Sequence, residues 1–365
     1  MSSNRLLAIS FVLAAPAAAQ YGLSTTVLST VSPTPIPRSI VMVPNPVGLH
    51  AICSMTQQSR QIPVDVTNPL APTVGAPATI TRDQYCDAVY TPDFGGRLVS
   101  AHRFGGLQVW DATMPSLAGP LPALGFSATN YSHEGLKTYF HQGVTYVLYG
   151  EQHTSPTTQG GLEIWRLDSG GVSFVGEHMM TAAAGRALTV SQDGRIVWQW
   201  GDQNNDNLDG VLRVYSTNGY TGAPILINTV THPFVQTYTD KDIESNAVQT
   251  NLLSALGWDG LRAIDISVVT SPVINTVFGP STSLFFDGVT FVPSTNIAVV
   301  WGLIRIGTTD IDFLAFFDAS IPGAAVPLLV IPPGFRVDDV KVQGNHLYCL
   351  GRDRAAAMAP ILVVY

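Results

Sequence analysis

Gly260-Leu261-Arg262-Ala263-Ile264-Asp265 is one copy of a six-residue phrase that recurs along the chain. The other copies occupy residues 60–65, 106–111, 161–166, 211–216, 313–318 and 360–365. Apolar residues alternate inside each copy, and the copies recur roughly every 50 residues. Alternation at this period predicts a β-propeller in which each copy forms one strand of one blade.

The second repeat shows how one blade is built. Residues 87–90, 97–101, 107–110 and 121–126 form four short β-rich runs, and Gly- or Pro-containing turns separate them. Four such runs predict a four-stranded antiparallel blade. The other repeats divide in the same way, and we therefore expect seven blades.

The chain ends close a ring in this interpretation. The seventh copy stops at Tyr365 and leaves its blade with three strands, while the alternating segment 23–31 has no repeat of its own. We predict that this segment supplies the missing strand, which removes two free sheet edges. The fold class is thus all-β: a seven-bladed propeller of four-stranded blades, closed by an N-terminal strand. A six-bladed ring with an irregular first copy is the alternative.

Residues 1–19 are expected to be a signal peptide. Arg5 precedes the apolar residues 6–13, and Ala17 to Ala19 form a small-residue cleavage site. The apolar stretch is too short for a membrane span. We expect cleavage near Ala19, one propeller domain over residues 20–365, and a secreted, periplasmic or cell-surface location.

Charge narrows the class of partner. Charged residues make up 12% of the chain, the net charge is −8, and lysine occurs only at positions 137, 241 and 341. A chain without a basic stripe is not expected to bind nucleic acid. We expect a monomer.

Three cysteines, Cys53, Cys86 and Cys349, leave at least one thiol unpaired in an oxidising compartment. Cys53 and Cys349 fall on equivalent strands, which point the same way around a propeller, so their geometry is poor for a bridge. Cys53 with Cys86 is the better candidate pair.

The repeated phrase resembles the LVIVD repeat of bacterial and archaeal surface propellers. Residues 260–267 followed by Ser271-Pro272-Val273-Ile274 are the most similar copy, and residues 64–74 are another. The chain also resembles exported "choice-of-anchor" propellers, in which a His-x-Gly precedes an acidic residue at the end of the next strand. Here these would be His133-Glu134-Gly135 and Glu151. The resemblance implies an exported propeller and no particular reaction.

A ligand face is predicted from loop length. The segments 150–161, 201–210, 307–312 and 351–360 are extended connections between second and third strands, which project on one face of a propeller. Elaborated loops on one face of a repeat scaffold form its usual binding surface.

One candidate site on that face contains His133, Glu134, Glu151 and His153. The inner and second strands of this blade run antiparallel, so these residues meet at one edge, where they are able to bind a divalent metal or share a proton. A hydrogen-bonded polar patch is the alternative, and the absence of metal-ligand spacing favours it.

A second candidate, for Ca²⁺, is Asp202, Asn204 and Asp206, which begin like a calcium-binding loop. Asn207 then replaces the turn glycine, and Arg213 stands where a bidentate glutamate is needed. The missing ligands favour a solvated hairpin, and no other cofactor is expected.

Asp or Asn also recurs at one place, just before the expected inner strand of four blades, at Asp87, Asn246, Asp287 and Asp339. A ring of negative charge at the channel mouth would attract a cationic ligand. Asx-turns at the links between blades are the alternative, and we favour it.

A serine-elbow motif and dinucleotide glycine motifs are absent from the sequence. We therefore expect a non-catalytic scaffold that binds a protein or a glycan on the long-loop face. A metal-assisted propeller hydrolase or lactonase is the alternative.

Overall fold

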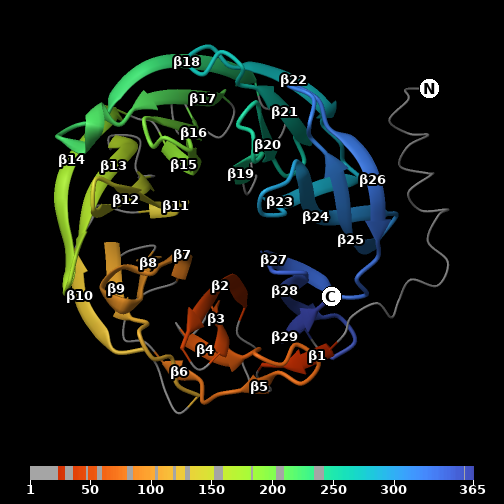
Figure 1. Ribbon diagram of the computed structural model, residues 1–365. Coiled ribbons are helices and arrows are strands. Elements are labelled where there is room, and N and C mark those ends of the chain that lie inside the picture. Colours follow the sequence, from red (N-terminus) through yellow and green to blue (C-terminus); the bar gives the residue numbers. More distant parts are fainter. Residues whose placement is uncertain are drawn as a thin grey trace.

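The computed structural model is a closed ring of β-sheets (Figure 1). It describes residues 24–28, 36–46, 48–55, 60–79, 85–102, 106–117, 121–127, 132–151, 159–181, 184–202, 209–233, 242–356 and 358–365. These residues form seven antiparallel sheets, and each sheet is one blade. The six-bladed alternative is therefore wrong.

Each blade has four strand positions, counted outward from the ring axis. The inner strands are β2 (Pro37–Asn45), β7 (Tyr85–Thr91), β11 (Ser132–His141), β15 (Ala184–Val190), β19 (Asp242–Ser245), β23 (Leu284–Phe291) and β27 (Arg336–Gln343). The second strands are β3 (Gly48–Met55), β8 (Arg97–His102), β12 (Val144–Glu151), β16 (Ile196–Asp202), β20 (Asn251–Ala255), β24 (Ile297–Ile306) and β28 (His346–Asp353). Each blade is named below by its inner strand.

The repeated phrase forms the third strands, as the sequence predicts. These are β4 (Arg60–Asp65), β9 (Gly106–Asp111), β13 (Gln159–Asp168), β17 (Asp209–Ser216), β21 (Leu261–Asp265), β25 (Thr309–Asp318) and β29 (Ala359–Val364). The outer strands are β5 (Thr73–Val74) with β6 (Ala78–Thr79), β10 (Ala123–Ser127), β14 (Gly171–Thr181), β18 (Ile225–Pro233), β22 (Val273–Phe278), β26 (Val326–Ile331) and β1 (Ser24–Val27). Two short 3-10 turns, Asp93–Gly95 and Asn218–Tyr220, join strands.

The alternation of the phrase reflects packing between blades. In the β19 blade, Leu261 and Ala263 pack in the core shared with the β23 blade. Ile264 points the other way and packs with Trp198 and Leu212 of the β15 blade. Successive side chains enter opposite cores because side chains alternate across a strand. Both faces of this third strand are consequently buried.

The N-terminal strand closes the ring, which confirms the prediction. β1 pairs antiparallel with β29, and Ser24 stands opposite Val364. The chain continues to Leu28, whose N–H donates to the carbonyl of Pro360 at 2.8 Å and whose side chain is 4% exposed. Ser24 Oγ donates to the carbonyl of Pro69 in the β2 blade at 2.6 Å. β1 thus joins the last blade to the first.

Two expectations from the sequence are wrong. Residues 307–312 are not an extended loop: Ile306 pairs with Thr309, so β24 and β25 continue into a hairpin that turns at residues 307 and 308. Cys53 and Cys349 are buried free thiols, so the expected bridge between Cys53 and Cys86 does not form. No helix among the described residues is long and apolar enough to cross a membrane.

We predict that Leu28→Ala lowers the free energy of unfolding by about 2–5 kcal/mol, because it removes a buried side chain from the core at the ring closure. Thr25→Ala, at an exposed position of β1, is the control and is expected to change stability little. Urea unfolding followed by circular dichroism measures both. Equal effects of the two substitutions would contradict the closing role of this segment.

Candidate functional site: the axial cavity and its upper rim

A cavity of about 470 Å³ lies on the ring axis. Its charged lining residues are Arg38, Asp87, Lys137, Asp242, Glu244, Asp287, Asp338, Asp339 and Lys341. The lining follows β27 from Asp338 to Gln343, so the cavity extends along the inner strands. We call it the axial cavity. We call the face that carries the links between blades and the second-to-third-strand connections the upper face.

Three of these carboxylates connect neighbouring blades. Each accepts the N–H of the next residue with one oxygen and the N–H of an inner-strand residue of the following blade with the other. The contacts between blades are Asp87 to Leu136 (3.2 Å), Asp242 to Val289 (3.0 Å) and Asp339 to Ile40 (2.9 Å). The contacts to the next residue are Ala88 (2.8 Å), Ile243 (2.9 Å) and Val340 (2.7 Å). We call these three arrangements the carboxylate clasps.

Two lysines lie among the clasps. Lys137 of β11 forms an ion pair with Glu244 of β19, across the intervening β15 blade. Lys341 Nζ lies 3.2 Å from Asp339 Oδ1 on its own strand. Burial lowers the pKa of both ammonium groups, but the attraction of the surrounding carboxylates outweighs it, and both pKa values are raised. The cavity therefore holds these lysines protonated.

The clasp carboxylates are poorly solvated. Burial raises the pKa of Asp242 to about 6, although Lys137 acts in the opposite direction. Burial likewise raises the pKa of Asp87, against the attraction of Lys341 and Lys137. A low-dielectric environment destabilises the charged form of a carboxyl group. Burial thus destabilises the charged carboxylates of the cavity wall, and the lysines of the cavity offset this effect only in part.

We predict that the Asp242→Asn variant gains stability relative to the wild-type protein as the pH rises. The folded-state pKa of Asp242 (about 6) exceeds its ordinary value of 3.8, so the folded state binds this proton more tightly. The wild-type protein therefore loses stability as the pH rises between these values, and the Asn variant lacks this loss. Urea unfolding at pH 4.5 and 7.5 compares the two proteins. A difference in unfolding free energy that is the same at both pH values would refute the raised pKa.

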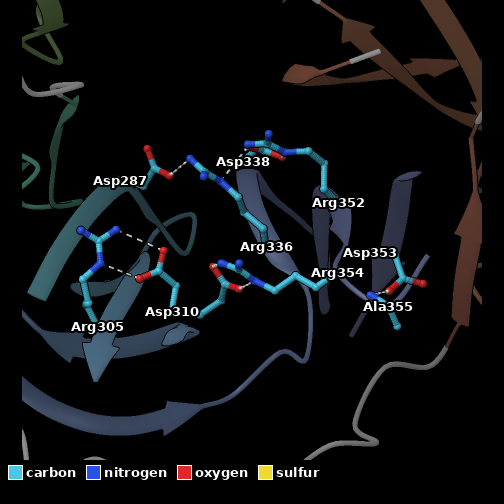
Figure 2. Close-up of polar contacts among 10 residues, drawn as sticks. Asp287, Arg305, Asp310, Arg336, Asp338, Arg352, Asp353, Arg354 and Ala355 are labelled. Carbon is cyan, nitrogen blue, oxygen red and sulfur yellow. Dashed lines mark hydrogen bonds and ion pairs between the residues drawn. The ribbon is translucent and has the colours of Figure 1, made fainter. Parts of the chain in front are cut away.

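An arginine–aspartate network covers the upper face of the β23 and β27 blades (Figure 2). Three arginines make paired hydrogen bonds to single carboxylates. Their distances are 2.8 and 3.2 Å for Arg305 to Asp310, 2.6 and 3.0 Å for Arg354 to Asp312, and 2.9 and 2.5 Å for Arg352 to Asp338. Paired bonds of this kind fix both side chains in one geometry.

Arg336 links the network to the axial cavity. Its Nη2 lies 3.7 Å from Asp287 Oδ2 and its Nε 3.5 Å from Asp338 Oδ1, and both carboxylates line the cavity. The hydrogen bonds from Arg305 lower the pKa of Asp310. Arg305 also lies 5.0 Å from the centre of the Trp258 ring, in a cation–π contact. The upper rim is thus a surface of fixed, mutually neutralised charges.

The predicted axial residues divide into two groups. Asp87, Asp287 and Asp339 do line the cavity, but Asp87 and Asp339 form contacts between blades instead of Asx-turns at the links. Asn246 lies elsewhere: it follows β19, is buried, and its Oδ1 accepts the N–H groups of Thr250 and Asn251. Its assignment to the channel mouth is wrong.

The other predicted residues lie at or beyond the limits of the described structure. The backbones of His133 and Glu134 belong to β11 and that of Glu151 to β12, where Ser132 is paired with Glu151. Their side chains, His153 and the side chain of Asp202 are outside the described residues, as are Asn204 and Asp206. Among the described residues, no three His, Cys, Asp or Glu side chains are grouped to hold a metal ion.

Several cavity residues were missed at the sequence level: Lys137, Asp242, Glu244, Asp338 and Lys341. One signal was available. The chain has only three lysines, and Lys137 and Lys341 both fall within inner strands. A scarce charged residue within an inner strand indicates a charged partner on the axis, because buried lysines are almost always paired.

Comparisons with known proteins bear on the fold. No family model matches the chain, so the resemblance to LVIVD-repeat propellers has no support from a family match. No curated protein matches its sequence. Among the many solved structures that match is Sqt1 of Saccharomyces cerevisiae, a WD40-type propeller. The TM-score is 0.57 and the sequence identity 11%, over 95% of this chain and 99% of that one. This likeness shows the propeller fold alone.

Proposed function

We propose that this protein is an exported, non-catalytic scaffold that binds a protein or a glycan at its upper face, with the axial cavity as the central contact. The observation that carries the proposal is the cavity itself, about 470 Å³ in volume and lined mainly by polar and charged side chains from six inner strands. A concave site with convergent polar groups is the usual place for a ligand. The leader-like residues 1–19 support export.

The state of the cavity carboxylates supports binding. Both oxygens of Asp87, Asp242 and Asp339 accept backbone N–H groups, so these side chains have one orientation. On the rim, Arg352 and Arg354 are fixed by paired hydrogen bonds. A wall that is ordered before the ligand arrives loses little conformational entropy on binding. Such a wall suits recognition of a ligand with complementary polar groups.

We predict that Thr138→Trp abolishes ligand binding, because Thr138 lines the cavity and the much larger indole takes up space that the ligand needs. The full chain would be tested on a glycan array and a peptide array, and each hit titrated by isothermal calorimetry. Thr138→Ser is the matched control and is expected to retain the affinity of the wild-type protein. Melting temperatures establish that both variants fold. The absence of any hit, or equal binding by the Trp variant, would contradict the proposal.

A further inference from the structure

The charge of the axial cavity is unbalanced at one place. Asp287 and Asp338 lie beside Arg336 and Arg352, and Asp339 lies beside Lys341. The remaining carboxylates, Asp87, Asp242 and Glu244, attract Lys137. Lys341 also attracts Asp87 and Asp242, so these three carboxylates and Asp339 share only two ammonium groups. This part of the wall carries more negative than positive charge, and so does the whole chain, whose net charge is −8. The potential there favours an additional cation.

The wall already accommodates ammonium groups. Lys137 reaches Glu244, and Lys341 reaches Asp339, from positions within inner strands. Despite burial, the pKa of both lysines is raised. Burial nevertheless raises the pKa of Asp242 to about 6, so the attraction of Lys137 does not offset the loss of solvation. A second cation in the cavity would stabilise their charged forms.

Two buried polar atoms indicate what else the ligand carries. Ser39 and Trp301 line the cavity and are 3% and 4% exposed. Within the described part of the chain, Ser39 Oγ and Trp301 Nε1 have no hydrogen-bond partner. An indole N–H only donates, so it requires an acceptor oxygen, and a buried donor left without one is costly. The ligand that satisfies this wall brings an oxygen acceptor as well as a positive charge.

The upper face adds an apolar contact. Ile306 and Ile311, near the end of the β24–β25 hairpin, are 49% and 38% exposed. They lie on neighbouring strands beside the pair of Arg305 and Asp310. Exposed aliphatic side chains on this face suit a protein surface better than a hydrated sugar.

We propose that the axial cavity receives a lysine or arginine side chain presented by a partner protein. Its cation lies against Asp87, Asp242 and Glu244, and a peptide oxygen of the same segment accepts the indole N–H of Trp301. This inference rests on the proposed scaffold function and narrows its ligand to a basic protein segment. The charge complementarity of the cavity selects such a segment over a neutral glycan.

The test uses peptides that differ in one charge. Acetyl-Gly-Arg-Gly-amide and the isosteric neutral peptide with citrulline in place of arginine are titrated against the full chain by NMR. We expect the arginine peptide to bind at least about tenfold more tightly, and to lose affinity as salt is added, because fixed carboxylates attract its charge.

Two substitutions with opposite expected effects locate the site. Glu244→Gln removes one carboxylate and is expected to lower the affinity for the arginine peptide about tenfold. Lys137→Met removes the competing internal cation and is expected to strengthen binding. If the Met variant is unstable alone, the arginine peptide should raise its melting temperature more than that of the wild-type protein. Asp168→Asn, in the hairpin between β13 and β14, is the surface control and should change nothing.

The outcomes separate the two proposals. Equal binding of the arginine and citrulline peptides, or equal effects of Glu244→Gln and Asp168→Asn, would overturn the cationic ligand. A neutral glycan that binds the wild-type protein but not the Thr138→Trp variant, while both peptides fail to bind, would overturn the cationic ligand and leave the scaffold function standing. If neither peptides nor array ligands bind, both proposals fail.

Discussion

Carboxylates hold the inside of this ring together. The inner strands of neighbouring blades belong to different sheets, so the ladders that stabilise each blade do not join them. At three junctions an aspartate on one inner strand accepts an N–H from the next, including the junction between the last blade and the first. A short side chain with two acceptor oxygens is able to fix its own turn of backbone and its neighbour at once.

The aspartates that connect the inner strands place negative charge in a poorly solvated cavity. Burial raises the pKa values of Asp87 and Asp242, and the two axial lysines offset the charge only in part. The cavity therefore acquires its electrostatic character from a structural requirement. The same groups that fix the inner strands give the axis its preference for a cation, which links the stability of the ring to its proposed ligand.

Much of the fold is predictable because its determinants are local and repeated. The phrase exemplified by residues 260–265 specifies a strand that is buried on both faces, and its period specifies the number of blades. Closure followed from an unpaired strand at each end of the chain, and β1 pairs with β29 accordingly. The sequence does not reveal the turn at residues 307 and 308, because β24 and β25 are ten residues long each and extend into the segment that forms a connection in other blades.

The candidate site was less predictable, because its contacts join distant repeats. Asp87, Asp287 and Asp339 were placed near the axis by their positions in the repeat, and they line the cavity. The same argument failed for Asn246, which follows its strand instead of lying within it. The pair of Lys137 and Glu244 spans two blades, and periodicity alone does not reveal which side chains cross the axis.

The carboxylate clasps are tested most directly by amide hydrogen exchange. In the wild-type protein the N–H of Ile40 donates to Asp339 Oδ2 at 2.9 Å and is expected to exchange slowly. In Asp339→Ala, we predict that the protection of Ile40 falls by at least about tenfold, because the N–H loses its acceptor. The amides of Leu136 and Val289, at the other two clasps, should keep most of their protection. Unchanged protection of Ile40 in the folded Ala variant would contradict the account.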